Sequence, residues 1–219
     1  MDDPIGSHPT RAEQLDILAT MIADQAMPND RVLDLGCGTG YVASLIFDKR
    51  RDLRYTGIDL KSESLAEAKT NLRGVEGRTD WLVGNLETVD EIGIPDDLYR
   101  FIFTALTFHD LPDDAKRDVI RFSSARLSSD GFFFLYDRLR LTEEMFFPLQ
   151  KSIWNRIDRV FGQGMRTAET FGSYEADIMP NNRPGCLDDY IKWFGEAGMK
   201  AQILHLHGNV VLMSGAKVG

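Results

Sequence analysis

The chain of 219 residues contains few of the residues that build disulfide frameworks, metal clusters or membrane spans. Its two cysteines, Cys37 and Cys186, and its four histidines have no spacing typical of a zinc site. We therefore expect neither a disulfide-rich secreted domain nor a metal centre. The longest unbroken apolar run, residues 132–136, is far too short to cross a membrane.

The sequence also lacks an excess of positive charge. It has 25 Lys and Arg against 34 Asp and Glu, a net charge of −9, whereas non-specific binding to nucleic acid depends on clustered Lys and Arg. The opening residues 1–11 contain neither the basic nor the apolar region of a secretory signal. We expect a soluble cytoplasmic protein without membrane contact and without a general nucleic-acid-binding surface.

Apolar, strand-like runs alternate with amphipathic segments in the first two thirds of the chain. The expected strands are 31–35, 53–59, 80–83, 99–106 and 131–136, and the expected helices are 11–25, 41–48, 62–72 and 113–127. Near-continuous apolar strands separated by helices are typical of a parallel sheet covered on both faces. The C-terminal residues predict one more helix, 188–197, and an antiparallel hairpin of 201–207 and 210–215.

Residues 138–186 interrupt this alternation. Apolar side chains at helical spacing predict a helix over 148–161 that ends at Gly162 and Gly164, followed by a loop over 167–185. The aromatic side chains of this segment indicate either a cover for a small, partly apolar acceptor or simple packing, including a dimer contact. We expect a single domain, 1–219, with a helical insert or lid at 138–186, and leave a homo-oligomer open.

Three polar markers fall at the ends of the first three expected strands. The glycine-rich turn 36–40 follows the first strand, where an open α/β sheet binds its ligand. Asp59 ends the second strand, about 20 residues further on, where a carboxylate accepts hydrogen bonds from ribose hydroxyls. Asn85 follows the third strand, where a side-chain amide can contact an adenine edge. Each residue alone has a structural explanation, but their order indicates a nucleoside ligand.

Two common nucleotide sites do not match this turn. The dinucleotide fingerprint has a third glycine where the helix packs on the strand, and Tyr41 occupies that position here. A phosphate-binding P-loop requires Gly-Lys-Ser/Thr, which does not follow the turn. The ligand is therefore expected to be a nucleoside without a polyphosphate.

The motifs resemble those of class I S-adenosylmethionine-dependent methyltransferases. VLDLGCGTGYVASLI is similar to the first motif of that family, GIDL to the second, GNLETV to the third, and ARLSSDGFFFLYD to the segment that enters the fifth strand. The ending LDDYIKWFGEAGMKAQILHLHGNVVLMSGAK resembles the final helix and strand pair. The sequence departs from the family at Asn85 and Arg100, where acidic residues are common, and at 129–131, where Ser-Asp-Gly replaces a Pro-Gly-Gly turn.

The resemblance implies a Rossmann-like α/β fold with five parallel strands, a C-terminal antiparallel hairpin and helices on both faces. It also implies S-adenosyl-L-methionine as cofactor. The implied cofactor contacts are Asp34, Gly36, Cys37, Gly38, Thr39 and Gly40 at the methionine and sulfonium, Asp59 at the ribose, Leu60, Asn85 and Leu86 at the adenine, and Thr104 beside the methionine.

The activity implied by the resemblance is methyl transfer to oxygen or nitrogen of a small-molecule acceptor. His109 follows the fourth strand and is the candidate general base, because an imidazole takes up protons near neutral pH. A purely structural hydrogen bond in the turn is the other interpretation of His109. His205 and His207 alternate on one face of a terminal strand, but the sequence suggests no third ligand, so a structural or solvent-facing role is favoured over a metal site.

Two other functions stay open. The first is S-adenosylmethionine-dependent modification of an RNA base, for which Arg156, Arg159 and Arg166 would supply a local basic patch. The second is a binding module that keeps the cofactor site without turnover. Detection of a methylated product would distinguish the two enzyme hypotheses, small-molecule methylation and RNA-base modification, from the binding module.

Overall fold

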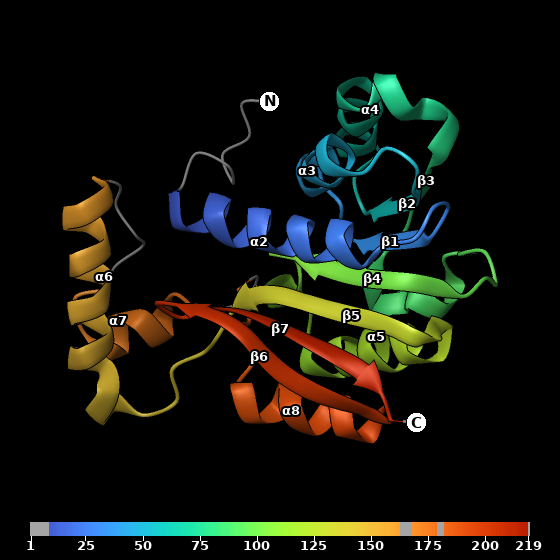
Figure 1. Cartoon of the computed structure of the whole chain (residues 1–219). Coiled ribbons are helices and arrows are strands. Elements are labelled where there is room, and N and C mark those ends of the chain that lie inside the picture. The colour runs from blue at the N-terminus through green and yellow to red at the C-terminus, as the bar shows by residue number, and fades with distance from the viewer. Residues whose placement is uncertain (1–8, 163–167, 179–181, 219) are drawn as a thin grey trace.

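The computed structural model describes residues 9–162, 168–178 and 182–218, which form a seven-stranded sheet between helices (Figure 1). The strands are β1 (Arg31–Leu35), β2 (Arg54–Asp59), β3 (Thr79–Val83), β4 (Tyr99–Ala105), β5 (Leu127–Arg138), β6 (Met199–His207) and β7 (Val210–Lys217). Their order is β3-β2-β1-β4-β5-β7-β6. β1 to β5 are parallel, and β7 is antiparallel to both β5 and β6. The predicted fold class is confirmed.

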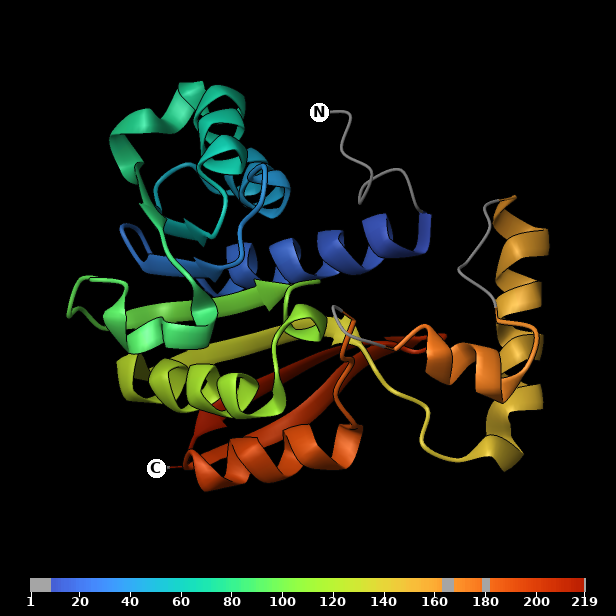
Figure 2. The same cartoon turned by 180° about the vertical axis from the view of Figure 1, so that it is seen from behind.

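Helices cover both faces of the sheet (Figures 1 and 2). One face carries α2 (Pro9–Gln25), α3 (Tyr41–Lys49) and α4 (Ser62–Asn71), and the other carries α5 (Asp113–Arg126) and α8 (Leu187–Glu196). Neighbouring residues of one strand serve the two cores alternately: Val32 packs on the α2 side, while Leu33 packs on the α5 side. Among the described residues, no helix has the length and apolarity needed to cross a membrane.

Short 3-10 helices make several of the connections. They are η1 (Arg73–Arg78) before β3, η2 (Leu86–Glu91) after it, η3 (Phe108–Asp110) after β4, and η4 (Glu144–Phe146) before α6. η2 and η3 begin within a few residues of the ends of their strands. They therefore bring the residues after β3 and β4 back to the carboxyl edge of the sheet.

The 138–186 segment lies beyond the carboxyl ends of the parallel strands, to one side of the layered body (Figures 1 and 2). It contains α6 (Phe147–Phe161) and α7 (Phe171–Ala176). The two helices share a small core of their own, built from Phe147, Trp154, Ala168, Tyr174 and Ile178. α6 ends at Gly162 in the left-handed conformation, as predicted, and Gly164 lies outside the described residues.

Two details of the expected secondary structure are wrong. The stretch 167–185 contains α7 instead of a continuous loop, because Thr170 and Ser173 form a capping box that begins a short helix. The expected turn at 129–131 belongs to β5, which begins at Leu127. A register shift between Tyr99 and Phe101 of β4 accommodates these extra residues of β5.

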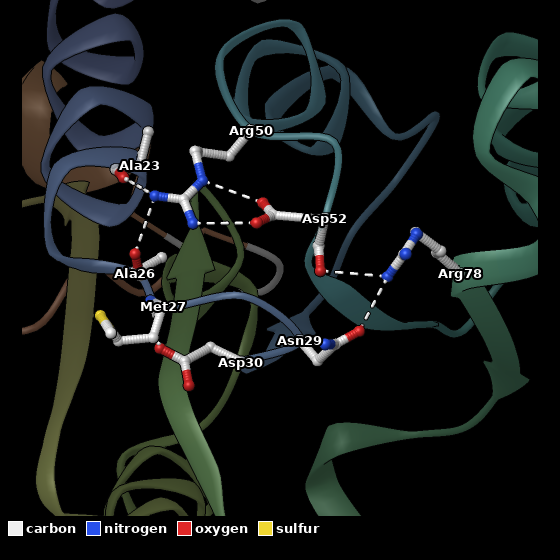
Figure 3. A network of polar contacts seen from close by, with 8 residues as sticks. All are labelled: Ala23, Ala26, Met27, Asn29, Asp30, Arg50, Asp52 and Arg78. Carbon is white, nitrogen blue, oxygen red and sulfur yellow. Dashed lines mark hydrogen bonds and ion pairs between the residues drawn. The ribbon is translucent and has the colours of Figure 1, made fainter.

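A polar network joins the opposite end of the sheet to α2 (Figure 3). Arg50, which follows α3, donates two hydrogen bonds to Asp52, at 2.9 and 3.1 Å. Its guanidinium also donates to the main-chain oxygens of Ala23 and Ala26, at 3.2 and 2.8 Å. The last carbonyls of a helix lack partners within the helix, so Arg50 fixes the end of α2 against the turn before β2.

We expect Arg50→Gln to lower the thermal midpoint by a few degrees, because it removes a charged donor from four acceptors at once. Arg51→Gln is the matched control, since Arg51 is exposed and forms no ion pair among the described residues. Differential scanning calorimetry of the two variants measures the difference. Equal midpoints would show that this network contributes nothing to stability.

Candidate functional site

The turn after β1 is hydrogen-bonded to the end of β2. The main-chain N–H groups of Gly36 and Cys37 both donate to the oxygen of Ile58, at 2.9 and 2.8 Å. The N–H of Gly38 donates to Oδ2 of Asp59, at 2.9 Å. The glycine turn and Asp59, predicted separately from the sequence, are therefore parts of one hydrogen-bonded unit.

There is a separate physical reason for glycine at each of three positions in this turn. All three have positive φ, at 88°, 53° and 78° for Gly36, Gly38 and Gly40, a region that other residues adopt only with strain. A Cβ on Gly36 would collide with the side chain of Thr107, and one on Gly40 would press on α4. A Cβ on Gly38 would meet nothing within 4 Å, so this part of the turn is open to a ligand.

Asp59 keeps acceptor capacity beyond the turn that it holds. Its Oδ1 accepts the N–H of Lys61 at 2.9 Å, and its Oδ2 accepts the N–H of Gly38. Each carboxylate oxygen has a second acceptor direction. Leu60, next in the chain, is 62% exposed and presents an apolar surface beside the carboxylate. The Asp59 carboxylate can bind a ribose hydroxyl, and the Leu60 side chain can pack on the flat side of a base.

Asp34 lies beneath the turn and is fully buried. Tyr55 of β2 donates its hydroxyl to Oδ2 of Asp34 at 2.6 Å, while Oδ1 has no hydrogen-bond partner among the described residues. Burial raises the pKa of Asp34 to about 8; the Tyr55 hydroxyl opposes this shift and the charge of Asp59 adds to it. The carboxyl is therefore neutral at pH 7, and a cation placed nearby would favour its ionised form.

A small cavity of about 140 Å³ opens above Asp34. Its walls are the turn residues 36–39, Leu15 and Tyr41 from α2 and α3, and Leu106 after β4. Leu106 has a φ of 55°, and a strained backbone of this kind is found most often at functional sites. Leu15 and Leu106 were missed by the sequence reasoning, because an apolar residue in a helix or after a strand carries no signal of ligand contact.

Cys37 faces the same cavity as a neutral thiol. Its side chain is buried, and this burial raises the pKa of the thiol, with a further increase from Asp34 and Asp59. A thiol that stays protonated is a poor nucleophile. Cys37 therefore contributes shape and polarizable surface to the cavity.

Asn85, the third marker from the sequence, lies at the start of η2. Oδ1 of Asn85 accepts the N–H of Glu87 at 3.0 Å and caps η2, which leaves its amide N–H groups for a ligand. Leu86 packs into the core on the α5 side, so its main chain is the part nearest the ligand edge. Thr104 is fully buried, and its neighbour Phe103 pairs with Asp34. Its side chain thus points to the opposite face of the sheet from Asp34.

His109 is held in η3 by Asp137 from the end of β5. Asp137 is fully buried and accepts hydrogen bonds from the main-chain N–H of His109 at 2.8 Å and from Nδ1 at 2.7 Å. Because a carboxylate accepts, Nδ1 is the donor in this pair, and in the neutral tautomer that this bond selects Nε2 is the acceptor. Nε2 lies 3.6 Å from Oδ1 of Asp110. The arrangement suits both a base and a structural anchor, and Asp137 was not singled out from the sequence.

The two histidines of the terminal hairpin, His205 and His207, both contact residues of other elements. Nδ1 of His205 lies 3.1 Å from Nε2 of Gln14 in α2, and His207 contacts the ring of Phe161. Within the described part of the chain, no three His, Cys, Asp or Glu side chains gather as a metal site. His205 therefore ties α2 to the hairpin.

Four of the aromatic residues in the 138–186 segment pack on one another. Phe147, Trp154, Phe171 and Tyr174 form edge and tilted contacts with centroids 6.0 to 6.2 Å apart. For these four the packing interpretation is correct. Phe146 and Phe161 are 52% and 37% exposed; because Phe161 contacts His207, Phe146 is the aromatic residue of this segment that is left for an external contact.

Comparison with known proteins defines the class of this domain. Residues 32–131 match a family model described as a methyltransferase domain. This segment begins in β1 and ends in β5, so it includes the glycine turn, Asp59, Asn85 and His109. Together with the fold, the match identifies residues 32–131 as a methyltransferase domain, in agreement with the resemblance of the motifs.

Two curated proteins resemble parts of the chain. A carboxy-S-adenosyl-L-methionine synthase of Campylobacter lari is 31% identical over 87 residues, which are 39% of this chain and 37% of that protein. The ribosomal RNA small subunit methyltransferase C of Proteus mirabilis is 29% identical over 160 residues, 70% of this chain and 42% of that protein. The chain thus spans about two fifths of the length of these relatives.

A solved structure extends the likeness to nearly the whole fold. The mitomycin 7-O-methyltransferase MmcR superposes with a TM-score of 0.61 at 14% identity, over 97% of this chain and 60% of that one. At this identity the likeness shows a shared fold. The sheet order and the hairpin described above are therefore those of a methyltransferase fold.

The buried carboxyl of Asp34 predicts a specific pH dependence of stability. The folded chain holds a proton up to about pH 8 that the unfolded chain, with its ordinary pKa of 3.8, has released. The free energy of unfolding should therefore fall between pH 4 and pH 8 through this group, by up to about 1.4 kcal/mol per pH unit. Asp34→Asn keeps an acceptor for Tyr55 and removes the titration.

Urea unfolding of both proteins at pH 5, 6, 7 and 8 provides the measurement. The stability of the wild type relative to Asp34→Asn should decline steadily over this series. Two parallel stability curves would contradict the raised pKa of Asp34.

Proposed function

We propose that the chain is an S-adenosylmethionine-dependent methyltransferase that transfers a methyl group to oxygen or nitrogen of a small-molecule acceptor. The observation that carries this proposal is the unit formed by the open glycine turn and Asp59, set within a methyltransferase domain. A sulfonium cofactor supplies an electrophilic methyl group. The remaining task of the protein is to bind, orient and desolvate the two reactants.

The residues present fit such a cofactor. Asp34 offers a buried, unpartnered oxygen beneath the cavity, and that oxygen suits a cationic ligand. Gly38 leaves open space beside the turn, and Asp59 keeps acceptor capacity for ribose hydroxyls. The exposed side chain of Leu60 and the free amide N–H groups of Asn85 suit a base. Thr104 is assigned no direct contact, because it faces the other side of the sheet.

The cofactor assignment predicts selective binding. S-adenosylhomocysteine should bind and raise the thermal midpoint, whereas NAD and ATP should not. Asp59→Ala should weaken binding of S-adenosylhomocysteine by about 1.5–3 kcal/mol, the usual range for hydrogen bonds to a charged group. Isothermal titration calorimetry gives both results.

Two controls separate ribose binding from loss of the turn. Asp80→Ala removes an exposed carboxylate from β3, away from the cavity above Asp34, and this variant should bind S-adenosylhomocysteine normally. Asp59→Asn keeps one acceptor for the N–H of Gly38 and should show intermediate affinity. If Asp59→Ala binds as tightly as the wild type, the ribose assignment is wrong.

The acceptor is proposed to enter between the cavity and His109. Nε2 of His109 is oriented by Asp137 to take a proton from a hydroxyl or an ammonium as the new bond forms. The likeness in fold to a mitomycin 7-O-methyltransferase favours a small-molecule acceptor. The ribosomal RNA methyltransferase among the relatives keeps an RNA base as the rival substrate.

The 138–186 segment is proposed as the lid over this acceptor. α6 and α7 stand beyond the carboxyl edge of the sheet (Figure 1), and the main-chain N–H of Arg183 donates to the oxygen of His109 at 2.5 Å. Trp154 donates to Asn209 in the hairpin turn at 3.2 Å. The segment is therefore tied both to the candidate base and to the hairpin, which supports a position over the acceptor.

Replacement of His109 tests the catalytic step. Incubation with a methyl-labelled cofactor and a panel of phenols, carboxylates, amines and RNA identifies the acceptor class. With the best acceptor, His109→Ala should lower turnover by roughly 10²–10⁴-fold and leave the affinity for S-adenosylhomocysteine unchanged. Near wild-type turnover by a folded variant would remove His109 from the catalytic residues, and transfer to RNA alone would overturn the small-molecule proposal.

A further inference from the structure

A second hollow lies where the parallel strands begin, at the opposite end of the sheet from the cavity above Asp34. It has a volume of about 530 Å³ and is lined by the turn before β2 and by η1. Four of its lining side chains are arginines, Arg51, Arg54, Arg73 and Arg78, and Glu76 is the one carboxylate among the lining residues. Such a concentration of positive charge stands out in a chain whose net charge is −9.

These four arginines differ from the other arginines around them. Arg31 and Arg50 have carboxylate partners, Asp97 at 2.7 Å and Asp52 at 2.9 Å. None of the four that line the hollow forms an ion pair within the described ranges of the chain. Four guanidinium groups against the single carboxylate of Glu76 give the hollow an excess of positive charge, so it is electrostatically complementary to an anion.

Two of the four are held in place by neutral acceptors. Arg78 donates to Oδ1 of Asn29 at 3.2 Å and to the main-chain oxygen of Asp52 at 3.0 Å (Figure 3). Nε of Arg73 donates to the oxygen of Thr70 at 3.3 Å. These bonds orient each guanidinium without neutralising it, and its other N–H groups stay available. A site ordered in this way loses less entropy when it binds.

The glycines of η1 add a second observation. Gly74 and Gly77 have no positive φ, and a Cβ on either would meet nothing within 4 Å. Neither backbone conformation nor packing therefore requires glycine at these positions. Their effect is to leave the main chain of η1 uncovered by side chains at the hollow, which gives an anion room beside the arginines.

We propose that this hollow binds a compact polyanion that carries two or more phosphate groups. The planar guanidinium donates two parallel hydrogen bonds to a phosphate, and four of them around one hollow match more than one phosphate. The strongly negative net charge opposes the approach of a long nucleic acid. The site is separate from the crevice: β2 begins at Arg54 beside the hollow and ends at Asp59 beside the glycine turn.

Titration with inorganic tripolyphosphate at low ionic strength tests the site. The wild type should bind it, and the double variant Arg51→Gln/Arg54→Gln should bind at least ten times more weakly. Arg117→Gln/Arg121→Gln is the matched control, because it removes two exposed charges from α5 and should bind like the wild type. No binding by the wild type, or an equal loss in both double variants, would overturn the proposal.

A second arm of the experiment distinguishes the source of the phosphates. A 12-nucleotide single-stranded RNA should bind more weakly than tripolyphosphate at the same salt concentration. Tighter binding of the RNA, with an affinity that falls steeply as salt is added, would overturn the compact ligand in favour of a nucleic-acid backbone. S-adenosylhomocysteine should not compete with tripolyphosphate, and competition between them would place the anion in the crevice instead.

Discussion

The site depends on the hydrogen bonds that fasten the turn after β1 to the end of β2. Ile58 accepts two N–H groups of the turn, and Asp59 accepts a third. The parallel register places these strand ends side by side, because Leu35 pairs with Ile58. A turn of three left-handed glycines would otherwise be too mobile to present a fixed cavity. Asp59 therefore shapes the turn before any ligand contacts it.

Buried carboxyl groups beside the crevice give the site its chemical character. Asp34 receives a hydroxyl from Tyr55 of β2, and Asp137 holds the ring and the main chain of His109. In both pairs the two members come from different elements of the fold, so their geometry depends on the whole sheet. In surroundings of low dielectric such interactions are strong. The protein thus places one carboxyl beneath the cavity and another behind the candidate base.

The sequence predicted the sheet and the positions of the glycine turn and Asp59 at neighbouring strand ends, because each depends on local pattern: apolar runs, glycine spacing and an acid at a strand end. It did not predict Tyr55, Leu106 or Asp137. These residues acquire their roles through strand pairing, which no local pattern records. The same limit applies to α7, whose capping pair Thr170 and Ser173 looks like an ordinary polar loop. For Thr104, the place at a strand end suggested a cofactor contact, whereas strand pairing turns its side chain to the face opposite Asp34.

The central claim, that the turn and Asp59 form one binding site for an S-adenosyl ligand, is tested most directly by a crystal structure with S-adenosylhomocysteine. We expect the ribose hydroxyls on Asp59, the amino-acid end in the cavity between Leu106 and the glycine turn, and the base against Leu60. Ligand density elsewhere on the protein, or a ribose that avoids Asp59, would contradict it.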